Sequence, residues 1–99
     1  MKPTDIFWLH GEMCAKALTL MRGKNRDYAG AEDGLKNYTQ AAQIAGISVT
    51  QVLVSRMADK MARLGNVALN GNVTEETVED TLLDLINFSV LIQAARSKP

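Results

Sequence analysis

The sequence has little cysteine and little proline, and each shortage excludes something. Its one cysteine, Cys14, cannot form an internal disulfide, and no Cys/His spacing typical of a zinc site is present. The two prolines stand at positions 3 and 99, so no residue between them breaks a helix by lacking a backbone N–H. We therefore expect a reducing environment, in which Cys14 packs as a small apolar residue.

Neither an excess of one charge nor a long hydrophobic run is present. The 11 basic and 11 acidic residues give a net charge of zero, whereas proteins that bind nucleic acids usually carry a basic excess. No stretch reaches the roughly 18 apolar residues of a membrane span. The first ten residues, MKPTDIFWLH, do not have the apolar core of a signal peptide. We expect a cytoplasmic protein that binds neither membranes nor nucleic acids directly.

The length of 99 residues predicts one domain over residues 1–99. A chain of this size buries only about 60 to 65 per cent of its unfolded surface, so we expect homo-oligomerisation to add to its core. Helix-breaking or turn-forming residues fall at three places: three glycines in 23–34, Gly-Ile-Ser at 46–48, and two glycines with three asparagines in 65–74. Apolar residues recur at helical spacing between these clusters, and no segment alternates like a strand. The sequence predicts an all-α bundle of about four helices, at about 4–21, 33–45, 48–67 and 74–96.

Local signals mark where these helices begin. Thr4 is an N-cap candidate for the first helix and Asp33 for the second. Ser48 and Gln51 have the spacing of a capping box, in which each side chain accepts the other residue's backbone N–H. The segment between the first two helices, GKNRDYAGAEDGLKNY, is richer in charge than a connection needs. We expect it to leave the first helix at Gly23 and to present Lys24, Arg26 and Tyr28 to a ligand.

The last predicted helix is apolar on almost every side except for one line. Glu76, Asp80, Asp84 and Asn87 follow one another at spacings of four, four and three residues. Each like-charged pair on such a line costs roughly 0.2 to 0.5 kcal/mol. We expect a divalent cation, a basic helix, or both to offset this repulsion.

The third predicted helix offers basic partners at the edge of its apolar side. They are Arg56, Lys60 and Arg63, with Asp59 among them. One interpretation is an interhelical ion-pair network that joins these cations to Asp80 and Asp84. The other is a site where acids hold Mg²⁺ and cations hold phosphate. Glu12 in the first helix also has two equally weighted interpretations: it can join a metal cluster, or it can pair with Lys16 four residues on.

Four blocks of the sequence occur in the order seen in a known family: GKNRDYAG, EDGLKNY, VLVSRMADKMARL and EDTLLDLINF. They resemble small phage and prophage proteins of the uncharacterised nucleotide-modification-associated family, over residues 20 to 93. More distantly the pattern resembles MazG-like all-α nucleoside triphosphate pyrophosphohydrolases. That resemblance implies a helical bundle that oligomerises, places Mg²⁺ on acids from two helices and binds a nucleotide. The chain departs from the family's E-x-x-E and E-x-x-D signatures, which puts catalysis in doubt.

The first functional hypothesis is a Mg²⁺-dependent nucleoside triphosphate pyrophosphohydrolase of phage type. Its catalytic residues would be Glu76, Asp80 and Asp84, with Glu76 taking a proton from the attacking water. The metal would be held by Asp80, Asp84, Asp59 and Glu12. The base would stack on Tyr28 or Trp8, and the nucleotide would be bound by Lys24, Arg26, Tyr28, Arg56, Lys60, Arg63 and Asn87.

Two alternatives belong to other classes. The same cations and Tyr28 can serve a non-catalytic protein that sequesters a nucleotide or a cyclic oligonucleotide immune signal in the host cytoplasm. The acids would then orient Arg56 and Arg63 instead of holding a metal. The third hypothesis is a protein-interaction module that inhibits a host complex and binds no small molecule.

Overall fold

The computed structural model describes residues 1–26, 33–71 and 75–97, and for residues 25–26 and 75–77 it describes the backbone alone. Within these ranges the chain is all-α, with four helices and no strand. The helices are α1 (Pro3–Arg26), α2 (Lys36–Ala45), α3 (Val49–Asn70) and α4 (Glu75–Arg96). The predicted fold class is confirmed.

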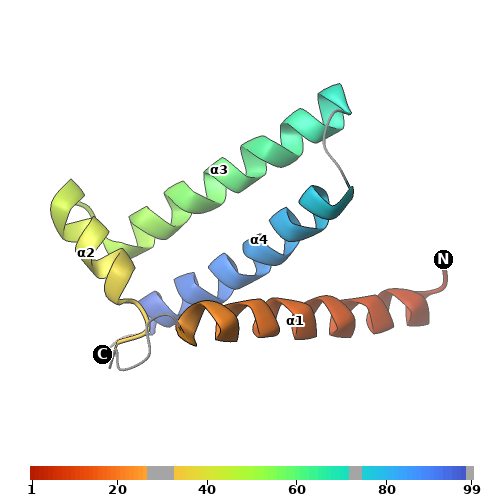
Figure 1. Cartoon of the computed structure of the whole chain (residues 1–99), viewed down its shortest axis with the longest axis horizontal. Helices are drawn as coiled ribbons and strands as arrows, with labels where there is room; N and C mark the ends of the chain where they lie inside the picture. Colours follow the sequence, from red (N-terminus) through yellow and green to blue (C-terminus); the bar gives the residue numbers. More distant parts are fainter. Residues whose placement is uncertain (27–32, 72–74, 98–99) are drawn as a thin grey trace.

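Helix α4 is the centre of the arrangement (Figure 1). It packs against α3 on one side and against α1 on the other, while the short α2 packs on α3. Helices α3 and α4 are joined by a short connection and run antiparallel, as short connections require. Helix α1 runs in the same general direction as α4, and its N-terminal part projects past the start of α4.

Helix α1 differs from its prediction at both ends. It begins at Pro3, not after a Thr4 cap, and proline suits the first helical position, where its missing N–H has no partner to lose. The Lys2 backbone N–H donates to Asp5 Oδ2 at 3.0 Å, so Asp5 provides the reciprocal half of a capping box. The helix also continues through Gly23 to Arg26. A glycine in a helix costs about 1 kcal/mol relative to alanine, which weakens a helix without ending it.

The predicted N-cap of the second helix is wrong, whereas the predicted capping box of the third helix is present. Asp33 does not cap the second helix, which begins at Lys36. Its carboxylate instead accepts the Leu35 N–H at 2.9 Å and braces the turn before the helix. The capping box is confirmed: the Gln51 N–H donates to Ser48 Oγ at 3.0 Å, and the Ser48 N–H donates to Gln51 Oε1 at 2.9 Å.

The core is small for the chain's length. Among the described residues, the buried hydrophobic side chains belong to Ala17, Leu35, Ala42, Val52, Leu53 and Leu83. The Cα radius of gyration is 15.4 Å, compared with about 13 Å for a compact domain of 100 residues. Cys14 is exposed, which corrects the expectation that it is packed. No helix in the described ranges is long and apolar enough to cross a membrane.

Candidate functional site

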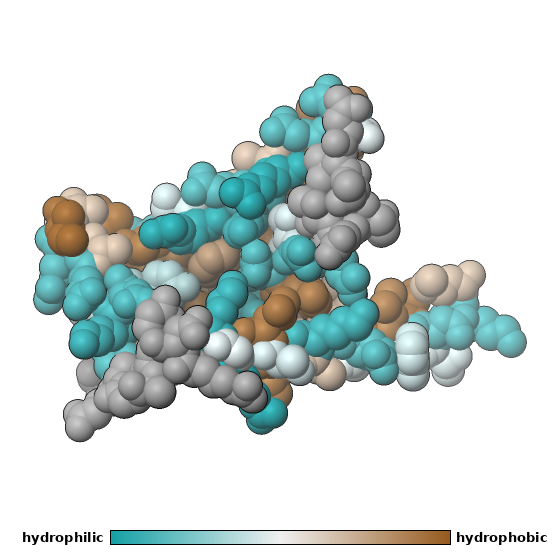
Figure 2. All heavy atoms as spheres, viewed as in Figure 1, coloured by the Kyte–Doolittle hydropathy of each residue, from teal (hydrophilic) through white to brown (hydrophobic). Residues whose placement is uncertain are grey.

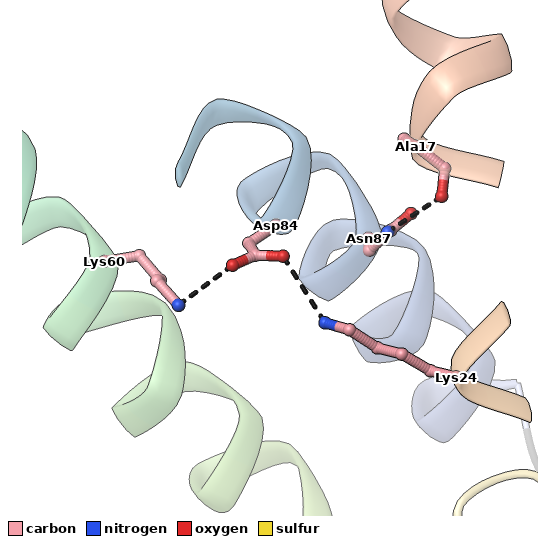
Figure 3. A network of polar contacts seen from close by, with 5 residues as sticks. All are labelled: Ala17, Lys24, Lys60, Asp84 and Asn87. Carbon is pink, nitrogen blue, oxygen red and sulfur yellow. Dashed lines mark hydrogen bonds and ion pairs between the residues drawn. The ribbon is translucent and has the colours of Figure 1, made fainter. Parts of the chain in front are cut away.

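Asp84 of α4 lies between two lysines from different helices (Figure 3). Its Oδ2 is 2.9 Å from Lys60 Nζ of α3, and its Oδ1 is 3.5 Å from Lys24 Nζ of α1. The side chains of Asp84 and Lys60 are only 18% and 22% exposed, whereas that of Lys24 is 67% exposed. The Asp84–Lys60 pair is therefore a partly buried link between α3 and α4, and Lys24 is the looser third member.

Asn87, one turn further along α4, joins α4 to α1. Its Nδ2 donates to the Ala17 backbone oxygen at 3.0 Å (Figure 3), and both residues are buried. The small side chain of Ala17 lets the two helices come close enough for this bond. The amide of Asn87, predicted as a nucleotide contact, is thus already used to hold α1 against α4.

A cavity of about 410 Å³ lies next to these contacts. All four helices contribute to its lining, together with the turn before α2. Its lining residues are Met21, Lys24, Asp33, Gly34, Lys36, Asn37, Tyr38, Arg56, Asp84, Asn87, Phe88 and Leu91. Cavities of 300 to 1,000 Å³ that combine apolar walls with a few charged groups are typical of small-molecule sites.

Positive charge predominates in this cavity. Lys24, Lys36 and Arg56 face two carboxylates, Asp33 and Asp84, and Asp84 is already paired with lysine. Arg56 makes no ion pair with any residue that the structure describes. The cavity therefore offers cations from three helices to an anionic ligand.

A second, more open hollow lies between α1 and α4 and is lined by several acidic residues. Glu12, Lys16, Glu79 and Asp80 are among its lining residues. Lys16 Nζ donates to Glu79 Oε1 at 2.8 Å, and this hydrogen bond, followed by the charge of Glu79, raises the pKa of Lys16. The salt bridge of Lys16 is therefore with Glu79, and not with Glu12.

The predicted acidic line divides between these two places. Asp84 lines the cavity of about 410 Å³, while Asp80, one turn earlier, lines the more open hollow between α1 and α4. Asp59 and Arg63 are exposed on α3 and line neither of the two. Over the ranges that the structure describes, no three His, Cys, Asp or Glu side chains form a group that could hold a metal ion. The predicted set of Asp59, Asp80, Asp84 and Glu12 is not brought together.

Three predicted site residues lie outside the described side chains. They are Arg26, Tyr28 and Glu76. Trp8 is described and 68% exposed, and it precedes Lys24 by sixteen residues, about 24 Å along a helix. Trp8 therefore does not reach the cavity.

The structure adds residues that the sequence-based prediction did not include. Lys36, Asn37 and Tyr38 begin α2, and Phe88 follows Asn87 on α4; all four line the cavity. The signal for the first three was present in the EDGLKNY block, whose cation and aromatic ring stand two residues apart. Phe88 carried no such signal, because a phenylalanine on an apolar helix is typical of a core.

Comparison with known proteins gives no further guidance, because no family model, no curated protein and no solved structure matches the chain.

Proposed function

We propose that the protein binds a nucleotide in the cavity lined by α1–α4, as a binding protein and not as a hydrolase. One observation carries this proposal: Lys24, Lys36 and Arg56 converge from three helices on a cavity that also contains two aromatic rings. Phosphate groups need cations and a nucleobase needs a flat apolar surface. This cavity offers both within about 410 Å³.

Arg56 and Lys24 are the groups best able to take the phosphates. Arg56 has no ion-pair partner among the described residues, and a guanidinium matches phosphate geometry with two parallel hydrogen bonds. Lys24 is mostly exposed and its contact with Asp84 is long, at 3.5 Å. Because Lys60 remains on Asp84 at 2.9 Å, Lys24 can move to a phosphate without leaving that carboxylate unpaired.

The base would lie against the apolar part of the lining. Tyr38 and Phe88 are half-buried there, with Met21 and Leu91 beside them. Stacking of a base on an aromatic side chain is worth about 1 to 3 kcal/mol and tolerates every base. Asn37 is exposed at the same cavity and offers an amide for a polar edge of the base.

A Mg²⁺-dependent pyrophosphohydrolase is the second candidate, favoured by the three carboxylates that line the more open hollow: Glu12, Glu79 and Asp80. Among the described residues no three such side chains are grouped closely enough to hold a metal ion, and Glu79 is engaged by Lys16. Asp84 is likewise engaged, by two lysines. The arrangement therefore favours a role for the acids in positioning the lysines over a role in holding a metal ion.

The test is a thermal-shift and calorimetry panel with AMP, ADP, ATP, pyrophosphate and cyclic dinucleotides, each with EDTA or with Mg²⁺. A ligand at a hundredfold excess over its Kd stabilises the protein by about 2.7 kcal/mol. For a domain of this size that corresponds to a rise in Tm of about 10 °C or more. We expect binding that persists in EDTA and no release of pyrophosphate from ATP.

Two arginines of α3 provide a matched pair of variants. We expect Arg56→Gln to weaken nucleotide binding at least tenfold, since a charge-assisted contact is worth about 1.5 to 3 kcal/mol. Arg63→Gln lies two turns away, is exposed and does not line the cavity, so binding should be unchanged. Equal losses in both variants, or no binding by any nucleotide, would refute the proposed site. Pyrophosphate release that needs Mg²⁺ and is lost in Asp80→Ala would favour the hydrolase.

A further inference from the structure

The two oxygen atoms of the Asp84 carboxylate have different surroundings. Oδ2 is 2.9 Å from Lys60 Nζ, and Lys60 does not line the cavity of about 410 Å³. Oδ1 is 3.5 Å from Lys24 Nζ, and Lys24 does line that cavity. In Figure 3 the two lysines approach the carboxylate from opposite sides. Oδ2 is therefore engaged away from the cavity, whereas Oδ1 lies on the side of Lys24, which borders it.

Binding of a nucleotide changes the surroundings of Oδ1. In the proposed complex Lys24 leaves Oδ1 for a phosphate group, while Lys60 keeps the carboxylate paired and ionised. The described residues offer Oδ1 no other ion pair. The Asp84 side chain is only 18% exposed, and an acceptor with so little access to water is costly to leave without a hydrogen bond. An ionised carboxylate can only accept, so the ligand has to supply the donor.

The place of Asp84 on α4 indicates which part of the ligand lies beside it. Phe88 follows four residues later on the same face, about 6 Å along the axis, and both side chains line the cavity. The aromatic residues of α1, Phe7 and Trp8, do not line it. They belong to the exposed apolar surface of the projecting first half of α1 (Figure 2). A base stacked on Phe88 thus places the sugar that is bonded to it near Asp84.

We propose that Asp84 Oδ1 accepts hydrogen bonds from the sugar, so that the preferred ligand is a ribonucleotide and not a deoxyribonucleotide. This inference rests on the proposed binding of a nucleotide in the same cavity. Ribose carries neighbouring 2′- and 3′-hydroxyl groups, and each can donate to a carboxylate oxygen. Recognition of a ribose hydroxyl by an acidic side chain is also how dinucleotide-binding folds hold their ligand.

Other acceptors of the lining are less suited to this role. The Asp33 carboxylate accepts the Leu35 N–H at 2.9 Å and braces the turn before α2. The Asn87 side chain is buried, and its amide donates to the Ala17 backbone oxygen at 3.0 Å. Asp84 Oδ1 differs from both, because its present contact is long and is made by a mostly exposed lysine.

Calorimetric titration of the complete chain in EDTA tests the proposal. The ligands are AMP, ADP and ATP, each as the ribo, 2′-deoxy and 2′,3′-dideoxy compound. We expect the dideoxy compound to bind at least about tenfold more weakly than the ribo compound, because a hydrogen bond to a charged group is lost. The 2′-deoxy compound retains one hydroxyl group and should lie between the two.

Two variants that each remove a carboxylate from the cavity provide the matched comparison. Asp84→Ala should bring the affinity ratio of ribo to dideoxy compound close to one, whereas Asp33→Ala should leave it as in the wild type. The ratio compares two ligands on the same protein, so a general loss of affinity or stability cancels. If Asp84→Ala does not fold, Asp84→Asn replaces it, and the ratio should fall because the acceptor has lost its charge.

Three results would overturn the proposal. Equal binding of the ribo and dideoxy compounds to the wild type would remove the sugar contact and leave nucleotide binding intact. An undiminished ratio in the Asp84 variant would show that another group binds the hydroxyls. Absence of binding by every compound would refute the proposed function itself, and the sugar contact with it.

Discussion

The two halves of α1 differ in composition and lie in different surroundings. The second half packs on α4 through Ala17, receives the Asn87 hydrogen bond and places Lys24 beside Asp84. The first half is richer in large apolar side chains, yet Phe7 and Trp8 remain more than two-thirds exposed. Apolar content therefore does not decide which half is buried. The starting point of α4 decides it, because among the described helices α1 packs only against α4.

The largest expected effect on stability distinguishes the buried contact between α1 and α4 from the exposed first half of α1. Leu83 is 4% exposed on α4 and lies near α1, so Leu83→Ala should lower the free energy of unfolding by about 2 to 5 kcal/mol. Phe7→Ala, measured by urea titration, should change the free energy of unfolding by less than about 0.5 kcal/mol, because Phe7 is 70% exposed. Comparable losses in both variants would show that the two halves of α1 are equally supported within one chain.

A smaller effect tests the hydrogen bond that holds the second half of α1. In Asn87→Asp an ionised carboxylate would face the Ala17 oxygen and could not donate to it. At neutral pH we expect a loss of about 1 to 3 kcal/mol of stability. The loss should shrink in acid, because a protonated carboxyl group can donate again.

The control for this variant is Asn66→Asp, at an exposed position of α3. Denaturant unfolding of both variants at neutral and acidic pH makes the comparison. A deficit of Asn87→Asp that does not change with pH would mean that the hydrogen bond is not what holds the helices together.

The smallest expected effect concerns the ion pair between Lys16 and Glu79. Its hydrogen bond raises the pKa of Lys16 in the folded state above the ordinary value. A raised lysine pKa gives stability that is fully present below the unfolded value of about 10.4 and is lost as the pH rises through the folded pKa. Glu79→Gln should therefore be slightly less stable than the wild type at neutral pH, and the gap should close in strong alkali.

Differential scanning fluorimetry of both proteins across this pH range provides the measurement. Because Lys16 is on the surface, the gap should also narrow in high salt. A gap that is insensitive to both pH and salt would indicate that Glu79 acts through packing.

The helices were predictable because their signals are local. Ser48 and Gln51 specify the start of α3 within four residues, and α4 was predicted to within one residue of its observed limits. The end of α1 was not predictable, since Gly23 is only a weak breaker. Gly46 and Gly71, which both adopt positive φ, do follow the ends of their helices.

The candidate site was predictable only in part. The Lys60–Asp84 pair was among the ion pairs expected from the two helical faces, and the structure confirms it. The division of Asp80 and Asp84 between two hollows was not foreseen. The two residues share one face of α4 but lie about 6 Å apart along its axis, and the neighbours of that face change along the helix. The contribution of Tyr38 and Phe88 depends on where α2, packed on α3, lies relative to α4, which is a tertiary property without a local signal.

Within the described part of the chain, α1 packs on the other helices through α4 alone, and this has a consequence for amide hydrogen exchange. Helices α2, α3 and α4 share contacts that do not involve α1, so α1 can swing away while the rest stays folded. The backbone N–H groups of α1 then exchange when α1 alone detaches. The free energy of that local opening is lower than the free energy of opening for Val52 and Leu53 in α3. Since Met21 and Lys24 line the cavity, a ligand held there ties α1 to the other helices, and the slowing of exchange along α1 becomes a measure of occupancy.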